Sequence, residues 1–225
     1  MHRRVLLVAF LTIAGCAPSG TDTDSSGQPA DITCHPTDPA SRSASCVQSF
    51  TPGEGAGFGQ DDYPDVIYGD PKGGGSHAGS TDVLSLGKGG TIIVGFGSTG
   101  IANGEGADFL VFENAFFIGD NPEKPFKELG EVSVSEDGDT WSTFACASAA
   151  YPYTGCAGWN PVYAGTDPAI SAYDPATAGG DAFDLADVGL EHARFVRIHD
   201  ISNLGAGGNA GFDLDAVTLV HPDDR

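Results

Sequence analysis

A run of four apolar residues, 109–112, lies between Asp108 and Glu113. An uninterrupted apolar run of this length, bounded by acids, predicts a central β-strand that is buried on both faces. A second stretch, 211–220, has the same composition of apolar residues and acids. We therefore expect 211–220 to form a strand that lies beside 109–112.

The 211–220 stretch also brings acids into an apolar setting. Side chains alternate between the two faces of a strand, so Asp213 and Asp215 are predicted to share a face with Val217 and Leu219. Burying a bare carboxylate is costly, and such groups are usually paired or bind a cation. The pattern indicates an oxygen-ligand site, and it indicates binding more readily than catalysis.

Other segments carry strand patterns between turns rich in glycine and asparagine. The predicted strands are 47–50, 81–86, 90–96, 131–135, 140–144 and 193–200. The glycines at 87–90 predict an antiparallel hairpin that joins 81–86 to 90–96. With 33 glycines and few helix formers, the chain is predicted to be an all-β, antiparallel β-sandwich with long glycine-rich loops.

The N-terminal region has the features of an export signal. A basic start, a short apolar run and small residues precede Cys16, and the run is too short to span a membrane. Residues 13–16, Ile-Ala-Gly-Cys, resemble the bacterial lipobox, which implies that Cys16 becomes the acylated first residue of the mature protein. We expect a signal peptide at 1–15, a lipidated N-terminus and flexible linker at 16–33, and one β-sandwich domain at 34–225. Ala17 follows the cysteine, which favours the outer membrane or cell surface.

The remaining four cysteines are Cys34, Cys46, Cys146 and Cys156. In an oxidising compartment they are expected to form disulfides, and short loop closure favours the pairs Cys34–Cys46 and Cys146–Cys156. All three connectivities of four cysteines stay open on sequence alone.

The net charge of −21 restricts the possible partners. Nucleic acid and anionic membrane surfaces would repel the chain, so we expect no nucleic-acid partner and contact with the membrane only through the lipid. Most of the acids are expected to confer solubility.

A long segment, 146–178, contains aromatic residues without periodicity. Four of them, Tyr151, Tyr153, Trp159 and Tyr163, are candidates for ligand binding, since aromatic faces stack on sugar rings. The alternative is that they fill a small core under the loop. The acidic stretch 180–187 is predicted to form a solvated helical turn.

Two later motifs carry a family resemblance. Ser133-Val-Ser-Glu-Asp-Gly-Asp-Thr-Trp141, followed by Ala193-Arg-Phe-Val-Arg-Ile198, resembles the discoidin or coagulation-factor type C group of galactose-binding-like β-sandwiches. The resemblance implies a jelly roll, a core position for Trp141 and a structural calcium ion. The motifs around 106–114 and 211–217 are also similar to those of bacterial surface lipoproteins. The chain has no cysteine pair joining the ends of the domain, so discoidin membrane-lipid or collagen binding is not carried over.

These observations predict a calcium site formed by Asp108, Glu113, Asp213 and Asp215, with help from loop carbonyls. The predicted function is that of a surface-exposed, calcium-stabilised binding module for an extracellular carbohydrate or surface protein. The alternatives are a structural or accessory component of an outer-membrane assembly and a polysaccharide-acting enzyme. No hydrolase or metalloprotease motif is present, so we expect no enzyme activity and assign no catalytic residue.

Overall fold

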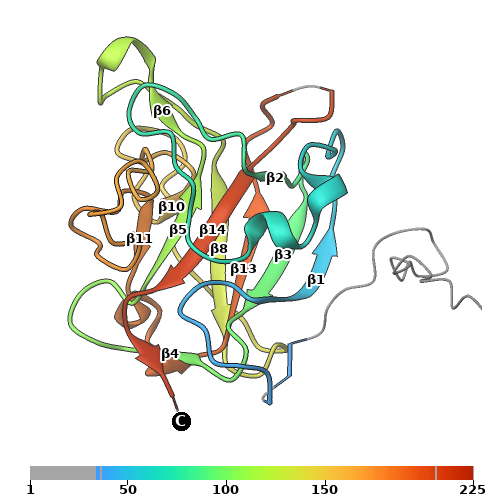
Figure 1. Cartoon of the computed structure of the whole chain (residues 1–225), viewed down its shortest axis with the longest axis vertical. Helices are drawn as coiled ribbons and strands as arrows, with labels where there is room; N and C mark the ends of the chain where they lie inside the picture. The colour runs from blue at the N-terminus through green and yellow to red at the C-terminus, as the bar shows by residue number, and fades with distance from the viewer. Residues whose placement is uncertain (1–33, 36, 206, 225) are drawn as a thin grey trace, which may run out of the picture. The chain divides into compact units, whose positions relative to one another are not determined.

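Antiparallel strands form most of the regular structure of this protein (Figure 1). The computed structural model describes residues 34–35, 37–205 and 207–224, and these belong to one compact unit. The predicted signal peptide, Cys16 and the linker lie outside the described residues. In the described part, no helix has both the length and the apolar character needed to cross a membrane.

The larger sheet has six strands, and its central strands pair in register. These strands are β1 (Cys46–Thr51), β3 (Thr91–Gly95), β13 (Phe195–Asp200), β8 (Gly130–Ser135), β10 (Cys156–Ala157) and β9 (Ser142–Thr143). Val196 of β13 pairs with Val94 of β3 and Val134 of β8, so three β-branched side chains form one row across the sheet. Such rows fit the pleated surface and stabilise the register.

The second sheet has four strands, in the order β11 (Asp181–Phe183), β5 (Phe109–Glu113), β14 (Asp213–Leu219) and β2 (Leu84–Ser85). β5 and β14 are neighbours, and every residue of β5 is buried. Both predictions made for the apolar run at 109–112 are therefore confirmed. The predicted all-β sandwich is also confirmed.

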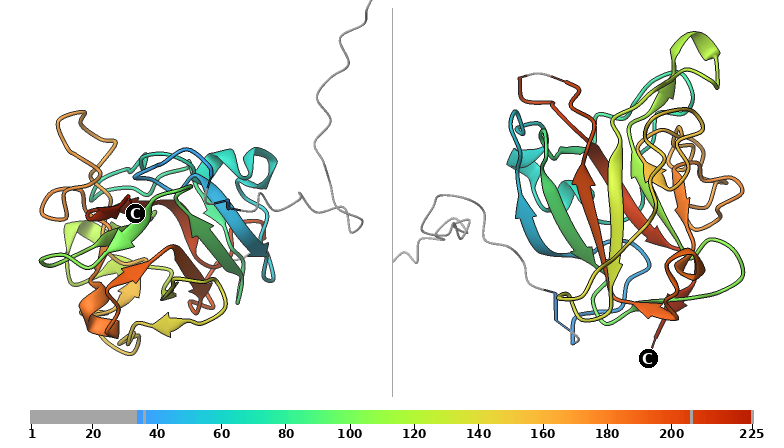
Figure 2. Two further views of the ribbon diagram at one scale, coloured as in Figure 1. Left: turned by 90° about the horizontal axis from the view of Figure 1, so that it is seen from below. Right: turned by 180° about the vertical axis from the view of Figure 1, so that it is seen from behind.

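The main core lies between the two sheets, whose opposite sides are seen in Figures 1 and 2. Val94 and Ile198 of the larger sheet and Phe109, Val111 and Leu214 of the smaller sheet belong to one buried cluster. Each such side chain contributes about 1.5–3 kcal/mol when it leaves water.

A second cluster covers the outer face of the smaller sheet. Leu110, Phe112 and Ala216 pack there against Val162 and Ala178 of the long loop that follows β10. This loop therefore has a structural role, because it provides the second apolar layer that buries β5 on both faces.

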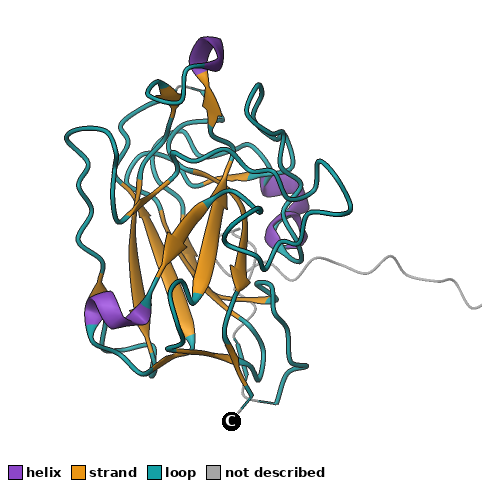
Figure 3. Cartoon of the chain, turned by 90° about the vertical axis from the view of Figure 1, so that its left-hand side faces the viewer, coloured by secondary structure: helices purple, strands orange, loops and turns teal. Residues whose placement is uncertain are grey.

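Short elements complete the domain, and loops dominate the ends of the sandwich (Figure 3). The remaining strands are β4 (Gly100–Ala102), β12 (His192–Ala193) and β15 (Pro222–Asp223), which form a three-stranded sheet, and the hairpin β6 (Phe116–Phe117) and β7 (Pro125–Phe126). The 3-10 helices are η1 (Gln60–Asp62), η2 (Asp65–Ile67), η3 (Ile118–Asp120) and η4 (Leu185–Val188).

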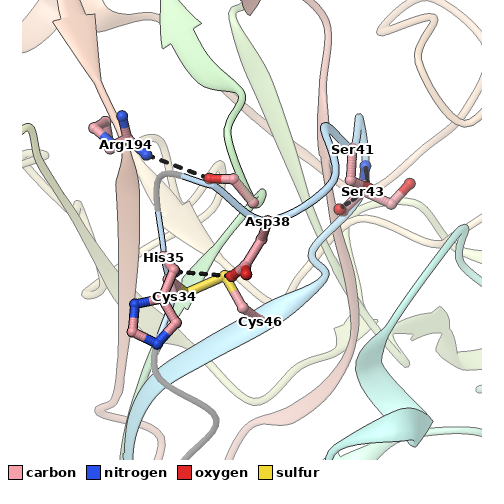
Figure 4. The surroundings of a disulfide bond; sticks show 8 residues. Cys34, His35, Asp38, Ser41, Ser43, Cys46 and Arg194 are labelled. Atoms are coloured by element: carbon pink, nitrogen blue, oxygen red, sulfur yellow. Dashed lines mark hydrogen bonds between the residues drawn. A yellow bond between two sulfur atoms is a disulfide. The ribbon is translucent and has the colours of Figure 1, made fainter.

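Both locally paired disulfides are present. Cys34 is bonded to Cys46 at the start of β1, and Cys146 is bonded to Cys156 at the start of β10. Figure 4 shows the first bond beside a turn in which the His35 N–H donates to the Asp38 carboxylate over 2.8 Å.

The alternation predicted for the last strand is wrong beyond Asp215. A β-bulge lies between Leu214 and Ala216, so Asp215 is an extra residue opposite β5. The bulge shifts the period of the strand by one. Val217 and Leu219 consequently join Leu214 in the main core, and Ala216 joins the second cluster.

The hairpin predicted for 81–86 and 90–96 is also wrong. β2 pairs with β14, whereas β3 pairs with β1 and β13. The turn at 87–90 therefore takes the chain from one sheet to the other.

Trp141 does not occupy the core position that the resemblance implied. It is half-buried, with the Arg197 guanidinium 4.5 Å from its ring centroid. Phe144 is the buried aromatic of this segment. The helical turn predicted for 180–187 is present only in its second half, where η4 begins at Leu185. The first half forms strand β11 instead, and Asp181 is buried rather than solvated.

Candidate cation site at the end of the sandwich

Three buried carboxylates meet where β5 ends and β14 begins. They belong to Glu113 of β5, Asp213 of β14, and Glu128, which lies between β7 and β8. One oxygen from each lies within 4.8 Å of the others. The exposed fractions of these residues are 1%, 6% and 3%, respectively. We call this set the acidic triad.

The two sheet residues of the triad are placed by strand pairing. Glu113 pairs with Leu214, so the neighbouring Asp213 lies beside the end of β5. Glu128 is held by the loop that follows β10, since its backbone N–H donates to the Gly158 carbonyl over 3.2 Å. The triad therefore depends on contacts between three segments that are distant in the sequence.

Glu113 is the most deeply buried acid of the triad. Neither of its carboxylate oxygens accepts a hydrogen bond. Burial raises the pKa of Glu113 well above its ordinary value, and the charges of Asp213 and Glu128 raise it further. The nearby Asn114 backbone N–H has a smaller, lowering effect, but it makes no hydrogen bond of normal geometry to either carboxylate oxygen. A group with these surroundings requires either a proton or a cation.

The pKa values of the other two acids of the triad are also raised. Burial raises the pKa of Glu128 to about 8, and the charges of Asp213 and Asp200 add to the effect. Burial raises the pKa of Asp213 to about 6, although Ser85 and Asn114 donate hydrogen bonds that lower it. No described lysine, arginine or histidine offsets these shifts.

Two further buried acids strengthen the negative field but are satisfied by their own donors. Asp181 accepts bonds from the Gly158 and Trp159 N–H groups and from the Asn160 side chain. Asp200 accepts bonds from the Gly89 and Phe212 N–H groups, among others. Both therefore stabilise loops around the triad.

The donor set of the triad determines which ion it suits. It contains only carboxylate oxygens, which are the ligands preferred by hard cations such as calcium and magnesium. Zinc sites use mainly histidine and cysteine, and neither belongs to the triad. Calcium accepts six to eight oxygens in flexible geometry, so three carboxylates and further oxygens from loops or ligands would fit it.

Asp108, the first of the four predicted metal ligands, is not part of the triad. It precedes β5 whereas Glu113 ends it, so one strand length of about 16 Å separates them. Its carboxylate accepts bonds from the Gly104 N–H at 2.7 Å and the Leu185 N–H at 2.7 Å, and His221 Nδ1 lies 2.8 Å away. Asp108 thus connects three segments at the opposite end of the strand.

Asp215 also lies outside the triad. Both of its carboxylate oxygens accept the Lys72 backbone N–H, at 3.0 and 3.1 Å. Burial raises its pKa to about 7. Of the four predicted ligands, the structure therefore brings together Glu113 and Asp213 and adds Glu128.

Three of the four predicted ligand-binding aromatics form a cluster. The ring centroids of Tyr151, Tyr153 and Trp159 are 5.8–6.2 Å apart with edge-to-face geometry. Lys127, which precedes Glu128, lies 4.8 Å from the Tyr153 ring centroid. Tyr163 makes no described ring contact with this cluster, and its backbone pairs with Ala178.

Glu128 was missed by the sequence reasoning because the residues around it show no strand period. The feature that could have identified Glu128 is its position as a charged residue two places before β8, which begins at Gly130. Asp181 was missed because its neighbours Asp184 and Asp187 made the stretch resemble a solvated turn.

The protein is therefore an all-β sandwich that carries a buried acidic triad, with only carboxylate oxygens as potential ligands, at the end of its smaller sheet. No known family model matches the chain, and no curated protein matches it significantly.

Proposed function

We propose that this protein binds a divalent cation, calcium, through Glu113, Glu128 and Asp213. The observation that carries the proposal is Glu113, which is 1% exposed and has no hydrogen-bond partner for either carboxylate oxygen. A bound divalent cation would offset two of the three negative charges of the triad and would give the Glu113 oxygens a partner.

Such an ion would have a structural consequence. It would connect β5, the segment before β8 and the start of β14 through one centre. A ligand that binds only the folded state stabilises it by mass action, by about 2.7 kcal/mol at one hundred times its dissociation constant. The ion would therefore link the Glu128 segment to the paired ends of β5 and β14.

Calorimetric titration with calcium, together with thermal unfolding in calcium and in EDTA, tests the proposal. The wild-type protein is expected to bind calcium and to unfold at a higher temperature in its presence. Glu113→Gln, which removes the buried charge and keeps the side-chain size, is expected to abolish both effects.

Asp215→Asn is the matched control. It makes the same chemical change at a buried acid that the sequence predicted as a ligand but that lies outside the triad. It is expected to leave calcium binding intact. Absence of calcium binding by the wild type, or equal loss in both variants, would contradict the assignment.

The cellular setting of this module is proposed on the sequence features of its N-terminus. The lipobox-like residues 13–16 support a lipid anchor at Cys16 and display at the outer membrane or cell surface. Cys16→Ser is expected to move the protein from the membrane fraction to the soluble fraction. Unchanged fractionation would contradict the anchor and leave the cation site unaffected.

A further inference from the structure

A shallow pocket lies directly beside the acidic triad. Its volume is about 160 Å³, and its lining includes Phe58, Ser80, Val83, Asn114, Asn209 and Asp213. Asp213 belongs to both the triad and the pocket, so a molecule in the pocket would touch the cation-binding residues. The pocket is smaller than the 300–1,000 Å³ typical of sites for drug-sized ligands, which suits a single ring.

Phe58 provides an exposed aromatic wall on a fixed backbone. Its side chain is 42% exposed. Its N–H donates to the Gly208 carbonyl, and its own carbonyl accepts the Ser85 N–H over 3.0 Å. A large apolar side chain that stays exposed on an ordered backbone is available for a ligand at low entropic cost.

The lining and the charge of the chain define the ligand. The Ser80 hydroxyl, the Asn114 amide oxygen and the Asn209 amide are neutral hydrogen-bonding groups next to the aromatic wall. The Asn114 amide nitrogen is already bonded to the Ser80 carbonyl and the Asp213 carboxylate. A net charge of −21 disfavours anionic ligands. One apolar face with polar edges is the recognition pattern of a sugar ring, whose C–H face packs on an aromatic ring while its hydroxyls make hydrogen bonds.

We infer that this pocket binds one ring of a neutral saccharide, with the ring against Phe58 and a pair of neighbouring hydroxyls directed at Asp213. This inference rests on the proposed calcium site, because the same hydroxyls would supply oxygens to the ion's shell. It places the ligand away from the aromatic cluster of Tyr151, Tyr153 and Trp159, whose rings already pack against each other.

Among the residues that the structure describes, four other large apolar residues are exposed, namely Ile118, Phe126, Tyr151 and Leu204. Tyr151 matches Phe58 in exposure, at 44% against 42%, but does not line the pocket. Tyr151→Ala is therefore the control for Phe58→Ala, because each removes one comparably exposed aromatic ring.

The test measures retention of the detergent-solubilised full chain on immobilised mannan, galactan and dextran, in calcium and in EDTA. Calcium binding by each variant is measured separately by calorimetry. The wild type is expected to bind at least one of these polysaccharides in calcium and none in EDTA. Phe58→Ala is expected to weaken polysaccharide binding about tenfold with unchanged calcium binding, and Tyr151→Ala is expected to match the wild type.

The outcomes separate this inference from the proposed function. Calcium binding without retention on any of the three polysaccharides would overturn the saccharide site and leave the cation site intact. Retention that persists in EDTA, or that is lost in Tyr151→Ala and kept in Phe58→Ala, would also overturn it. Failure of the wild type to bind calcium would overturn both.

Discussion

The carboxylates of Glu113 and Glu128 lie within 4.8 Å of each other although the whole β6–β7 hairpin separates them in the sequence. Two like charges at this distance repel each other by a few kcal/mol at an effective dielectric constant near 20. Without a cation, the pair is favourable only while protons remain bound, in agreement with the raised pKa of both groups. The same arrangement becomes favourable at neutral pH when a divalent ion replaces those protons.

Glu128→Gln is expected to weaken calcium binding by at least tenfold, because it removes one of the three charged ligands. The variant should also be at least as stable as the wild type in EDTA, since it removes a repulsive buried charge. Calorimetry and urea unfolding measure the two effects. Glu123→Gln, an exposed residue of the same segment, is the control and should change neither. Unchanged affinity in Glu128→Gln would remove this residue from the site.

The buried Asp181 predicts how stability depends on pH. Burial raises its pKa to about 7 in the folded protein, although hydrogen bonds from Trp159, Gly158 and Asn160 lower it. In the unfolded chain the pKa is about 3.9. The folded state therefore holds the proton more tightly, and its stability falls as pH rises from about 4 to about 7.

Asp181→Asn removes this titration. In EDTA, the wild type is expected to lose more unfolding free energy between pH 5 and 8 than the variant, by up to a few kcal/mol in an order-of-magnitude estimate. The other buried acids are common to both proteins, so the difference between the two slopes isolates Asp181. If the unfolding free energies of the two proteins, measured by urea unfolding, change equally with pH, the pKa of Asp181 is not raised in the folded state.

Much of the fold followed from local pattern. The apolar run at 109–112 has no polar position, which is consistent only with burial on both faces, and β5 is buried throughout. Its pairing with β14 brought Glu113 close to Asp213. The predicted pairing of these two strands therefore identified two of the three triad residues, Glu113 and Asp213.

The errors also have physical causes. Asp108 and Glu113 flank one strand, and the rise of about 3.3 Å per residue alone places them at opposite ends. The bulge at Asp215 depends on pairing with β5, which the sequence of one strand does not specify. Glu128 is positioned by the Gly158 loop, so its role required tertiary contacts.

The Cys146–Cys156 disulfide closes the loop that carries Tyr151 and Tyr153. Replacing both cysteines with serine is expected to lower the unfolding free energy by about 3 kcal/mol, the loop-closure value for a short loop. The near-ultraviolet circular dichroism of the three-ring cluster should weaken as well. The double serine variant of Cys34 and Cys46 is the control, since that bond lies at β1 and should leave this signal unchanged.

Gly158 links the backbone of the aromatic loop to the triad. Its φ is +88°, and a Cβ there would lie 2.2 Å from the Glu128 carbonyl oxygen and 2.9 Å from Phe212 Cε2. Gly158→Ala is therefore expected to displace Glu128, to lower the unfolding free energy by several kcal/mol and to weaken calcium binding.

Gly189→Ala separates backbone strain from this clash. Gly189 has a φ of +69°, but nothing lies within 4 Å of a Cβ placed there. It is expected to cost only the 1–2 kcal/mol of a left-handed alanine and to leave calcium binding unchanged. Thermal unfolding and calcium calorimetry of both variants measure the difference. If Gly158→Ala costs no more stability than Gly189→Ala and keeps full affinity, the close packing of this loop on Glu128 is not what positions the triad.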